Sequence, residues 1–101
     1  MIVRFANKAV QELYESDVKV GVIKYKFAKQ VVEKYKKRIE QLISANSFVD
    51  ISQIRSLHLE KLKGNRSGQL SVRVNDQYRI CFRELNETEI AVEILELTDY
   101  H

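Results

Sequence analysis

The sequence contains few of the residues that build disulfides, metal sites and tight turns. Its 101 residues include no proline, no tryptophan, three glycines, one cysteine and two histidines. The one cysteine, Cys81, excludes an internal disulfide, and the missing secretory hydrophobic segment favours a reducing cytoplasm. No apolar run approaches the roughly 18 residues of a membrane span. We therefore expect a soluble, cytoplasmic protein.

Several enzyme classes lack support because their motifs are missing. The sequence has no glycine-rich phosphate loop, no Cys/His cluster with metal-ligand spacing and no serine in a recognisable triad context. We therefore expect neither a cofactor nor a metal. Apolar residues make up 45% of the chain, enough for one modest core, so residues 1–101 are predicted to form a single domain.

Basic residues are absent from the last part of the chain. Residues 84–101 contain six acids and no Lys or Arg, a balance of −6. Residues 1–83 hold all 17 Lys and Arg against eight acids, a balance of +9. A body this basic attracts polyanions, as nucleic-acid-binding proteins do. A solvated surface of mixed charge is the alternative.

The first half of the chain has the apolar spacing of helices. Asn7 is a good N-cap for a first helix, and residues 17–21 are predicted to form a connector. Between residues 25 and 43 the apolar residues recur in the i, i+3, i+4, i+7 pattern of an amphipathic helix. Residues 45–55 have weak periodicity and are predicted as a loop or a short turn of helix.

Strands are predicted before and after this helical region. From residue 57 onward the apolar period becomes two, which is typical of half-buried strands. The predicted strands are residues 2–5, 57–61, 70–74, 78–83 and 90–97. This order favours an α+β domain with a short N-terminal strand, two helices and then an antiparallel sheet of three to four strands, with the helices packed on one face.

Arginines gather on one face of the predicted sheet. Arg73 and Arg79 lie in adjacent strands across a tight turn, opposite the apolar rows, and Arg83 lies further along. An uncovered sheet face lined with arginine favours a bound anion, and the arginine fork suits phosphate. Further cations in the preceding segment extend this patch: Lys61, Lys63 and Arg66. The alternative is a cross-strand charge ladder with acids of the last strand, Glu89, Glu93 and Glu96.

The chain ends on three polar groups, Asp99, Tyr100 and His101. RNA carries its own nucleophile, the 2′-hydroxyl, so its cleavage needs only a base, an acid and cations that stabilise the charged phosphorane, without a metal. Arg73 and Arg79 could supply the cations. The candidate proton-transfer groups are His58, Tyr100 and His101. A solvated tail is the alternative for the chain end, and a structural role is the alternative for His58.

Motifs from residue 57 onward resemble HigB toxins of the RelE/ParE superfamily. The resemblance also covers the order of a strand, two helices and a strand meander. It implies a RelE-like toxin of a type II toxin–antitoxin pair that cuts mRNA in the ribosomal A site without a metal. It further implies a HigA-like antitoxin with a helix-turn-helix fold. The motifs are Leu57-His58, Leu62-Lys63-Gly64-Asn65-Arg66-Ser67-Gly68, Ser71-Val72-Arg73-Val74-Asn75, Gln77-Tyr78-Arg79-Ile80-Cys81-Phe82-Arg83 and Asp99-Tyr100-His101.

The resemblance also implies roles for single residues. Arg79 matches the sheet arginine associated with phosphate stabilisation in RelE-like relatives, and Arg73 joins it by its facing and proximity. The residues that match family active-site positions are Asp99, Tyr100 and His101. RNA or ribosome contacts are expected from Lys61, Lys63, Arg66 and Arg83, and from Lys36 and Lys37 on the long helix. The alternative for the helix lysines is a solvated face.

The chain departs from the family pattern at two places. Many HigB proteins have histidine in Leu-His-x-Leu-Lys-Gly, where this chain has Glu60, and His58 lies two residues upstream. In a strand this offset moves the group by roughly 6.6 Å, which is too far for an identical contact. The family often has an aromatic pair after the glycine turn, where this chain has Gln69 and Leu70, so we expect weaker base stacking there.

Two other functions fit the same fold. ParE-like members of the superfamily poison gyrase, and a non-catalytic RNA-binding module would also suit the basic body. Tyr100 and His101 favour the nuclease, because a gyrase binder has no evident need for proton-transfer groups at its end.

Overall fold

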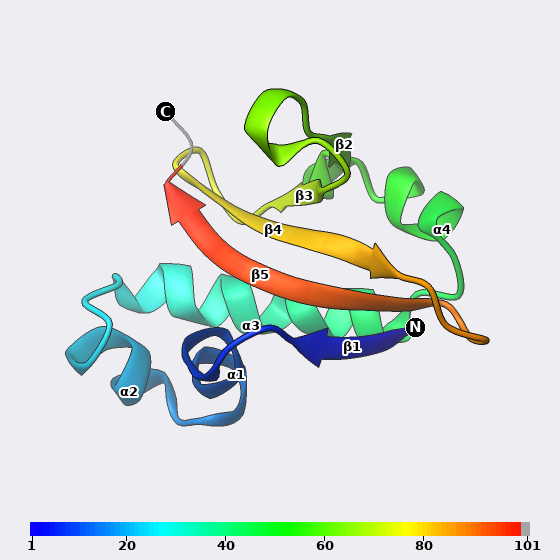
Figure 1. Ribbon diagram of the computed structural model, residues 1–101. Coiled ribbons are helices and arrows are strands. Elements are labelled where there is room, and N and C mark those ends of the chain that lie inside the picture. Colours follow the sequence, from blue (N-terminus) through cyan, green and yellow to red (C-terminus); the bar gives the residue numbers. More distant parts are fainter. Residues whose placement is uncertain (100–101) are drawn as a thin grey trace.

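The strand predicted at the start of the chain lies at one edge of a five-stranded sheet (Figure 1). In the computed structural model, which describes residues 1–99, this strand, β1 (Ile2–Phe5), pairs parallel with the last strand, β5 (Ala91–Asp99). The α+β class and the antiparallel meander are confirmed, and β1 makes the sheet mixed. The remaining strands follow β5 in antiparallel order: β4 (Tyr78–Leu85), β3 (Leu70–Arg73) and β2 (Glu60–Lys61).

The two helices predicted in the first half of the chain are α1 (Lys8–Glu15) and α3 (Lys29–Ser44). Asn7 caps α1 as expected, because its side-chain oxygen accepts the Val10 backbone N–H at 3.1 Å. The long helix begins four residues later than predicted. Lys26 has a φ of 63°, in the left-handed region, and this conformation interrupts an α-helix.

The prediction of a connector at residues 17–21 is wrong, because most of this segment belongs to a helix, α2 (Val18–Ile23). Its valines and Gly21 have weak helix propensity. Asp17 nevertheless caps the helix by accepting the Lys19 backbone N–H at 2.9 Å. Gly21 allows close packing, since a Cβ there would lie 2.7 Å from Val32 Cγ2 on α3. Capping and tertiary packing therefore override the local propensity.

The segment between α3 and β3 contains further short helices. α4 (Phe48–Gln53) begins after Ser47, and Arg55–Leu57 forms a 3₁₀ turn, in agreement with the predicted short turn of helix. The strand predicted from residue 57 is wrong at its start. His58 has a φ of 42°, which breaks the extended alternation, and β2 contains only two residues.

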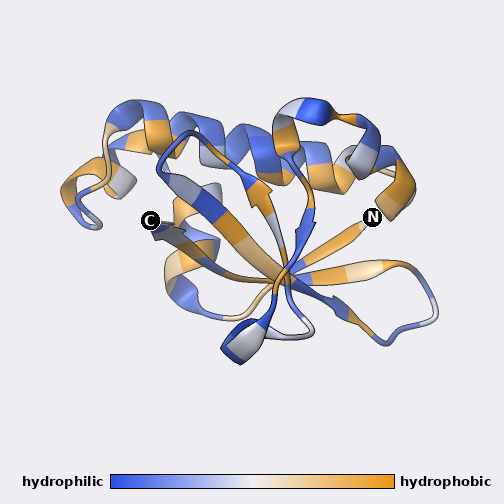
Figure 2. Ribbon diagram, turned by 90° about the horizontal axis from the view of Figure 1, so that it is seen from above, coloured by the Kyte–Doolittle hydropathy of each residue, from blue (hydrophilic) through white to orange (hydrophobic). Residues whose placement is uncertain are grey.

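The core lies between the sheet and the helices α1 and α3, which cover the same face of it (Figure 1). Hydrophobic and hydrophilic residues alternate along the long helix and the strands, as expected of elements with one buried face (Figure 2). The Tyr35 hydroxyl donates to the Val10 carbonyl at 2.7 Å inside this core. No helix within residues 1–99 has the length and apolar character to cross a bilayer. Residues fully buried in the core include Tyr35, Ile39, Leu42, Val72, Ile80, Phe82 and Ile94.

Candidate functional site

The sheet face opposite α1 and α3 carries the arginines predicted from the sequence. Arg73 and Arg79 are direct partners in the β3–β4 register, so both side chains leave the sheet on the same face. Arg83 follows on β4, opposite Glu93 of β5. The predicted placement of these three arginines on one face is therefore confirmed.

Arg79 is held in one orientation by its neighbours. Only 8% of the residue is exposed. Its Nε donates to Ser71 Oγ at 2.8 Å, and its Nη2 donates to the backbone carbonyl of His58. Glu60 Oε1 lies 3.9 Å from the same Nη2. These contacts fix the plane of the guanidinium.

The sheet face around Arg79 is covered, which corrects the expectation of an open arginine-lined face. Ser71 and Cys81 point to this face and are fully buried. Residues 58–69 fold back over it, and Arg66 reaches across to Glu96 of β5 (Figure 1). Burial raises the pKa of the Cys81 thiol. On this face Arg79 is therefore covered, whereas Arg73 and Arg83 keep partly exposed side chains.

Two cations follow the charge-ladder alternative. Arg83 Nε donates to Glu93 Oε1 at 2.8 Å, and Arg66 pairs with Glu96. Arg73 instead pairs with Asp76 in the turn after β3. Glu89, the third acid of the predicted ladder, forms no ion pair in the part of the chain that the structure describes.

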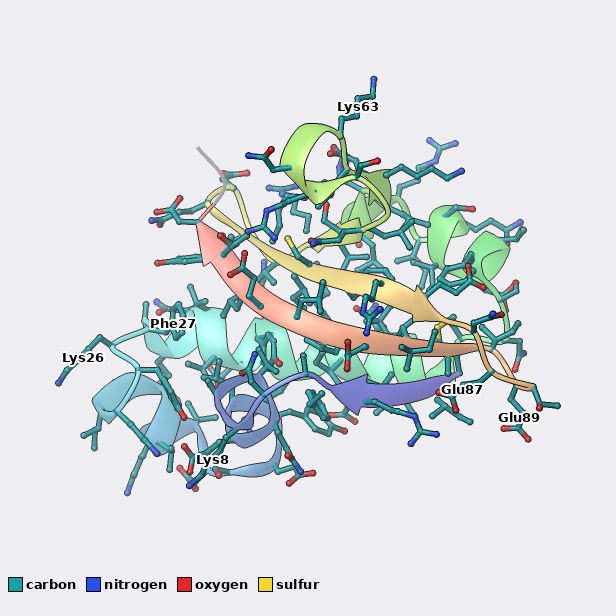
Figure 3. All side chains as sticks on the ribbon, in the orientation of Figure 1. Lys8, Lys26, Phe27, Lys63, Glu87 and Glu89 are labelled. Atoms are coloured by element: carbon teal, nitrogen blue, oxygen red, sulfur yellow. The ribbon has the colours of Figure 1, made fainter. Side chains whose placement is uncertain are left out.

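The lysines of the segment before β3 point in different directions. Lys63 is exposed and projects outward from the segment that covers the arginine face (Figure 3). Lys61 is the register partner of Leu70 and shares its face, which is the core side of the sheet. There it lines a groove of about 730 Å³ with Phe48 and Leu59. Only Lys63 of this pair therefore lies with the arginines.

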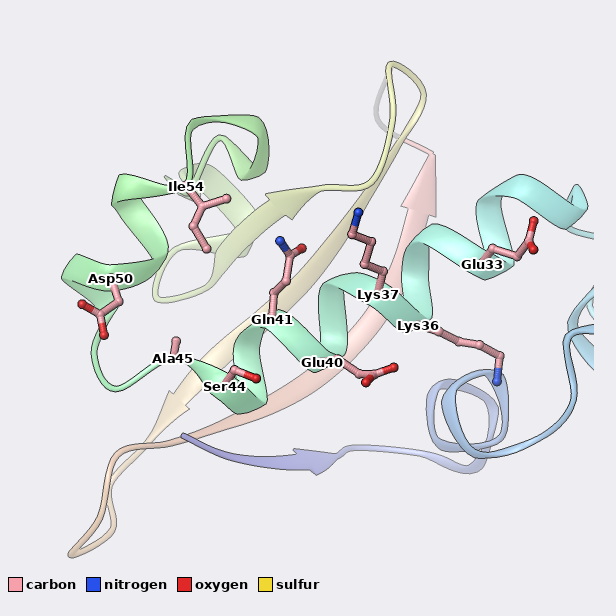
Figure 4. Close-up of a pocket in the computed structure, with 9 residues that line it drawn as sticks. All are labelled: Glu33, Lys36, Lys37, Glu40, Gln41, Ser44, Ala45, Asp50 and Ile54. Atoms are coloured by element: carbon pink, nitrogen blue, oxygen red, sulfur yellow. The ribbon is translucent and has the colours of Figure 1, made fainter.

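Lys36 and Lys37 belong to α3, on the helix side of the sheet. Lys36 Nζ donates to the carbonyl of Tyr14 at 2.7 Å and to that of Ser16, at the end of α1. Both lysines line a groove of about 510 Å³, in which Lys37 and Gln41 rise from the same side of α3 while Lys36 points away (Figure 4). The structure does not bring the two lysines together with Arg79.

The end of β5 reaches the arginines. Thr98 is the register partner of Arg79, and Asp99 is that of Tyr78. The Asp99 carboxylate accepts the Gln77 side-chain N–H at 2.9 Å. The register thus places Asp99 one residue beyond the partner of Arg79. The predicted proton-transfer groups Tyr100 and His101 lie outside the described residues.

His58 lies outside the strands, which corrects the strand geometry assumed for it. The residue is exposed, and its backbone carbonyl is the group that contacts Arg79. Because its φ of 42° is in the left-handed region, the alternation of side chains along a strand cannot be used to assign His58 to a face of the sheet. Within residues 1–99, no three His, Cys, Asp or Glu side chains are grouped so that they could hold a metal ion.

Sequence analysis missed one residue near these arginines, Arg38 of α3. It is only 8% exposed. Its Nε donates to the Arg73 carbonyl at 3.1 Å, and its Nη1 donates to Gln41 Oε1 at 2.9 Å. The available signal was its spacing, because position 38 continues the buried row of Val31 and Tyr35. We call Arg38, Arg73 and Arg79 the arginine corner.

Comparison with solved structures identifies the class of the fold. The YoeB/ParE toxin from Agrobacterium tumefaciens matches with a TM-score of 0.57 and 19% identity, covering 100% of both chains. The heterotetrameric YoeB-YefM toxin–antitoxin complex from Staphylococcus aureus matches with a TM-score of 0.51 and 22% identity, covering 100% of this chain and 97% of that one. The fold is therefore that of toxins from toxin–antitoxin systems.

Comparison of the sequence narrows this class to a family. A model of the family described as RelE-like toxin of type II toxin–antitoxin system HigB matches residues 3–101. The chain is also 32% identical over 102 residues to Endoribonuclease HigB of Proteus vulgaris, covering 100% of both chains. The chain belongs to the HigB-like toxin family, and the resemblance seen in the sequence is confirmed.

Proposed function

We propose that this chain is a toxin that cuts mRNA on the ribosome as an endoribonuclease. The observation that carries the proposal is the position of Arg79. Its guanidinium is fixed by Ser71 and by the backbone of His58, opposite the β5 residue that precedes Asp99. Arg79 thus lies beside the end of β5, one register position from Asp99, the first of the three residues that we propose as the proton-transfer group. The 32% identity to an endoribonuclease supports the same activity.

The proposed reaction is attack by the ribose 2′-oxygen on the adjacent phosphorus. The new bond joins the 2′-oxygen to phosphorus, and the bond from phosphorus to the 5′-oxygen breaks. The products are a 2′,3′-cyclic phosphate and a 5′-hydroxyl. Tyr100 and His101 transfer the two protons, one from the 2′-hydroxyl and one to the leaving oxygen, with Asp99 as the carboxylate that orients them. Arg79 stabilises the charge that develops on the phosphorane, assisted by Arg73.

RNA and ribosome contacts come from the cations around this site. Lys63 is exposed on the segment above the arginine face and can contact phosphate directly. Arg66 and Arg83 already pair with carboxylates, so an RNA phosphate must compete with Glu96 and Glu93. Lys61, Lys36 and Lys37 lie on the other side of the sheet and would contact ribosomal RNA instead of the cleaved strand.

The family is defined by pairing with an antitoxin. We infer that the partner of this chain is a HigA-like protein with a helix-turn-helix fold. Gyrase inhibition and catalytically inert RNA binding are less favoured, because the family model matches residues 3–101 and the endoribonuclease relative covers the whole chain.

The test is cleavage of mRNA on programmed ribosomes by the purified protein. We expect cuts at fixed codon positions, with downstream fragments that carry a 5′-hydroxyl. His101→Ala, or deletion of residues 100 and 101, should abolish the cuts because the proton-transfer groups are lost. His58→Ala is the matched histidine variant and should reduce the rate far less, since the His58 backbone carbonyl that accepts from Arg79 is kept in this variant.

Three outcomes would contradict the proposal. Intact mRNA alongside trapped gyrase–DNA complexes would support a ParE-like activity. Ribosome binding without cleavage would support an inert RNA-binding module. Downstream fragments with a 5′-phosphate would rule out attack by the 2′-hydroxyl, because that reaction leaves the phosphate on the upstream fragment.

A further inference from the structure

Arg38 is a nearly buried cation whose hydrogen-bond partners are neutral. It extends from α3 to the edge of the sheet, where it donates to the Arg73 carbonyl at 3.1 Å and to the Gln41 side chain at 2.9 Å. In the part of the chain that the structure describes, no carboxylate lies within ion-pair distance of it. Buried cations are normally paired, because an unpaired charge in a protein interior costs several kcal/mol.

The charged group that shifts the pKa of Arg38 has the same sign as Arg38 itself. Burial, and secondarily the positive charge of Arg73, lower the pKa of Arg38 below its ordinary 12.5. Two guanidinium groups that repel each other are thus held at the end of β3. A backbone carbonyl and an amide hold Arg38 there, and these acceptors position a cation without neutralising it.

The acid that pairs with Arg73 is held only weakly. Arg73 pairs with Asp76, three residues further along in the turn, and the Asp76 side chain is 97% exposed. An ion pair with so solvated a carboxylate contributes little and is easily exchanged. An incoming anion can therefore take the place of Asp76 on Arg73, whose positive charge also acts on Arg38.

We propose that Arg38 and Arg73 form a phosphate-binding subsite at the edge of β3, which holds an RNA phosphate next to the one that is cleaved. The inference rests on the proposed function, because it takes Arg79 as the arginine of the scissile phosphate. Arg73 is the register partner of Arg79, so a strand with regularly spaced phosphates engages both positions.

The experiment measures binding of a short 2′-O-methyl RNA by fluorescence anisotropy over a range of salt concentrations. This RNA lacks the attacking hydroxyl, so binding is observed without cleavage. Arg38→Gln and Arg73→Gln should each weaken binding about tenfold at low salt, the effect of one charge-assisted contact. Each should also reduce the slope of log K against log salt by about 0.7, the value for one phosphate contact on a single strand.

Two further variants separate charge from structure. Arg38→Lys keeps the charge and should retain the salt slope of the unchanged protein. Arg4→Gln is the matched control, because Arg4 lies on β1 and pairs with Glu87, and its slope should not change. Arg73 is partly exposed, so Arg73→Gln tests the subsite even if Arg38→Gln does not fold, which thermal unfolding will reveal.

The subsite is overturned if folded Arg38→Gln and Arg73→Gln keep the original slope, or if the unchanged protein does not bind the RNA. It is also overturned if these variants lose affinity for the antitoxin alone, since the corner would then bind an acidic protein segment. These outcomes are independent of the cleavage assay. A protein that cuts mRNA but shows no arginine-dependent slope refutes only the subsite, and the reverse result refutes only the nuclease.

Discussion

Arginines in two regions of the molecule have different kinds of partner. Arg4 on the edge strand β1 makes a two-pronged contact with Glu87, in the turn between β4 and β5, at 2.7 and 2.9 Å. Arg83 of β4 donates to Glu93 of β5 at 2.8 Å. We call these two pairs the paired edge. At the arginine corner, Arg38 and Arg79 donate hydrogen bonds to carbonyls, a hydroxyl and an amide. Exposed carboxylates also lie beside this corner, Asp76 at Arg73 and Glu60 at 3.9 Å from Arg79.

This difference separates two uses of arginine. At the paired edge the carboxylates satisfy the charge within the fold, and the exposed pairs contribute little beyond surface electrostatics. At the corner, hydrogen bonds to neutral acceptors fix the buried guanidinium groups of Arg38 and Arg79, and the carboxylates of Asp76 and Glu60 beside this corner are exposed to solvent. Fixed cations of this kind are suited to stabilise charge on a bound molecule. The comparison predicts that function depends on the corner and that the Arg4–Glu87 pair is dispensable.

Replacement of Arg79 should give the largest effect. We expect Arg79→Ala to reduce single-turnover cleavage on programmed ribosomes by about 10²-fold or more, because a preorganised donor to the phosphorane is lost. Arg79→Lys should recover part of this loss, since it restores the charge without the fork. Arg4→Ala, the matched change at the paired edge, should alter the rate by less than about twofold.

Full activity in Arg79→Ala would remove this residue from the site and break the comparison. Because Arg79 is buried against Ser71, thermal unfolding must accompany the rate measurement. If Arg79→Ala does not fold, its rate says nothing about catalysis, and the cleavage rate of Arg79→Lys then decides the question.

Two neighbouring lysines of α3 differ in the same way, because one is engaged within the fold and the other is not. Lys36 is engaged by the carbonyls of Tyr14 and Ser16 at the end of α1, whereas Lys37 is exposed. We expect Lys36→Ala to lower the free energy of unfolding by about 1 to 2 kcal/mol, since charged donors are lost from the last turn of a helix. Lys37→Ala should leave stability within about 0.5 kcal/mol.

For ribosome binding, in contrast to stability, we expect Lys37 to matter more than Lys36. Charge reversal in Lys37→Glu should reduce the salt dependence of binding, because a lysine that is not engaged inside the fold can contact phosphate. An unchanged salt slope for Lys37→Glu, or equal stability losses for both alanine variants, would contradict the assignment.

Much of the fold could be predicted because periodicity reports burial. The rows that include Val72, Ile80 and Phe82 alternate with polar residues, so the strands and their core face follow directly. The missed parts depend on contacts between distant segments or on single backbone angles. The helix α2 needs Gly21 packed against Val32, and the start of β2 is set by the left-handed angle of His58.

The candidate site could be predicted only where the sequence separation is short. A tight turn fixes the register of its two strands, so Arg73 and Arg79 were expected as neighbours. Arg38 joins them from 35 residues away, and Arg66 reaches Glu96 across 30 residues. No local pattern encodes such contacts. The cover over the arginine face was missed for the same reason.

The smallest expected effect is the acid sensitivity of the paired edge. Hydrogen bonding and the positive charge of Arg4 hold the pKa of the Glu87 carboxyl below its ordinary 4.5. A carboxyl whose pKa is lowered by folding stabilises the protein above its unfolded pKa, and this contribution is lost as the pH falls through the folded pKa. We therefore expect Glu87→Gln to be slightly less stable than the unchanged protein at pH 7. This difference should shrink as the pH falls below about 4.5.

The measurement is thermal unfolding of both proteins between pH 7 and pH 3. Glu89→Gln is the matched control, because Glu89 lies two residues further along the same turn and forms no ion pair within residues 1–99 (Figure 3). A difference for Glu87→Gln that persists at pH 3, or an equal pH-dependent difference for Glu89→Gln, would mean that Arg4 does not compensate Glu87. The paired edge would then no longer differ from the arginine corner in the way its charges are satisfied.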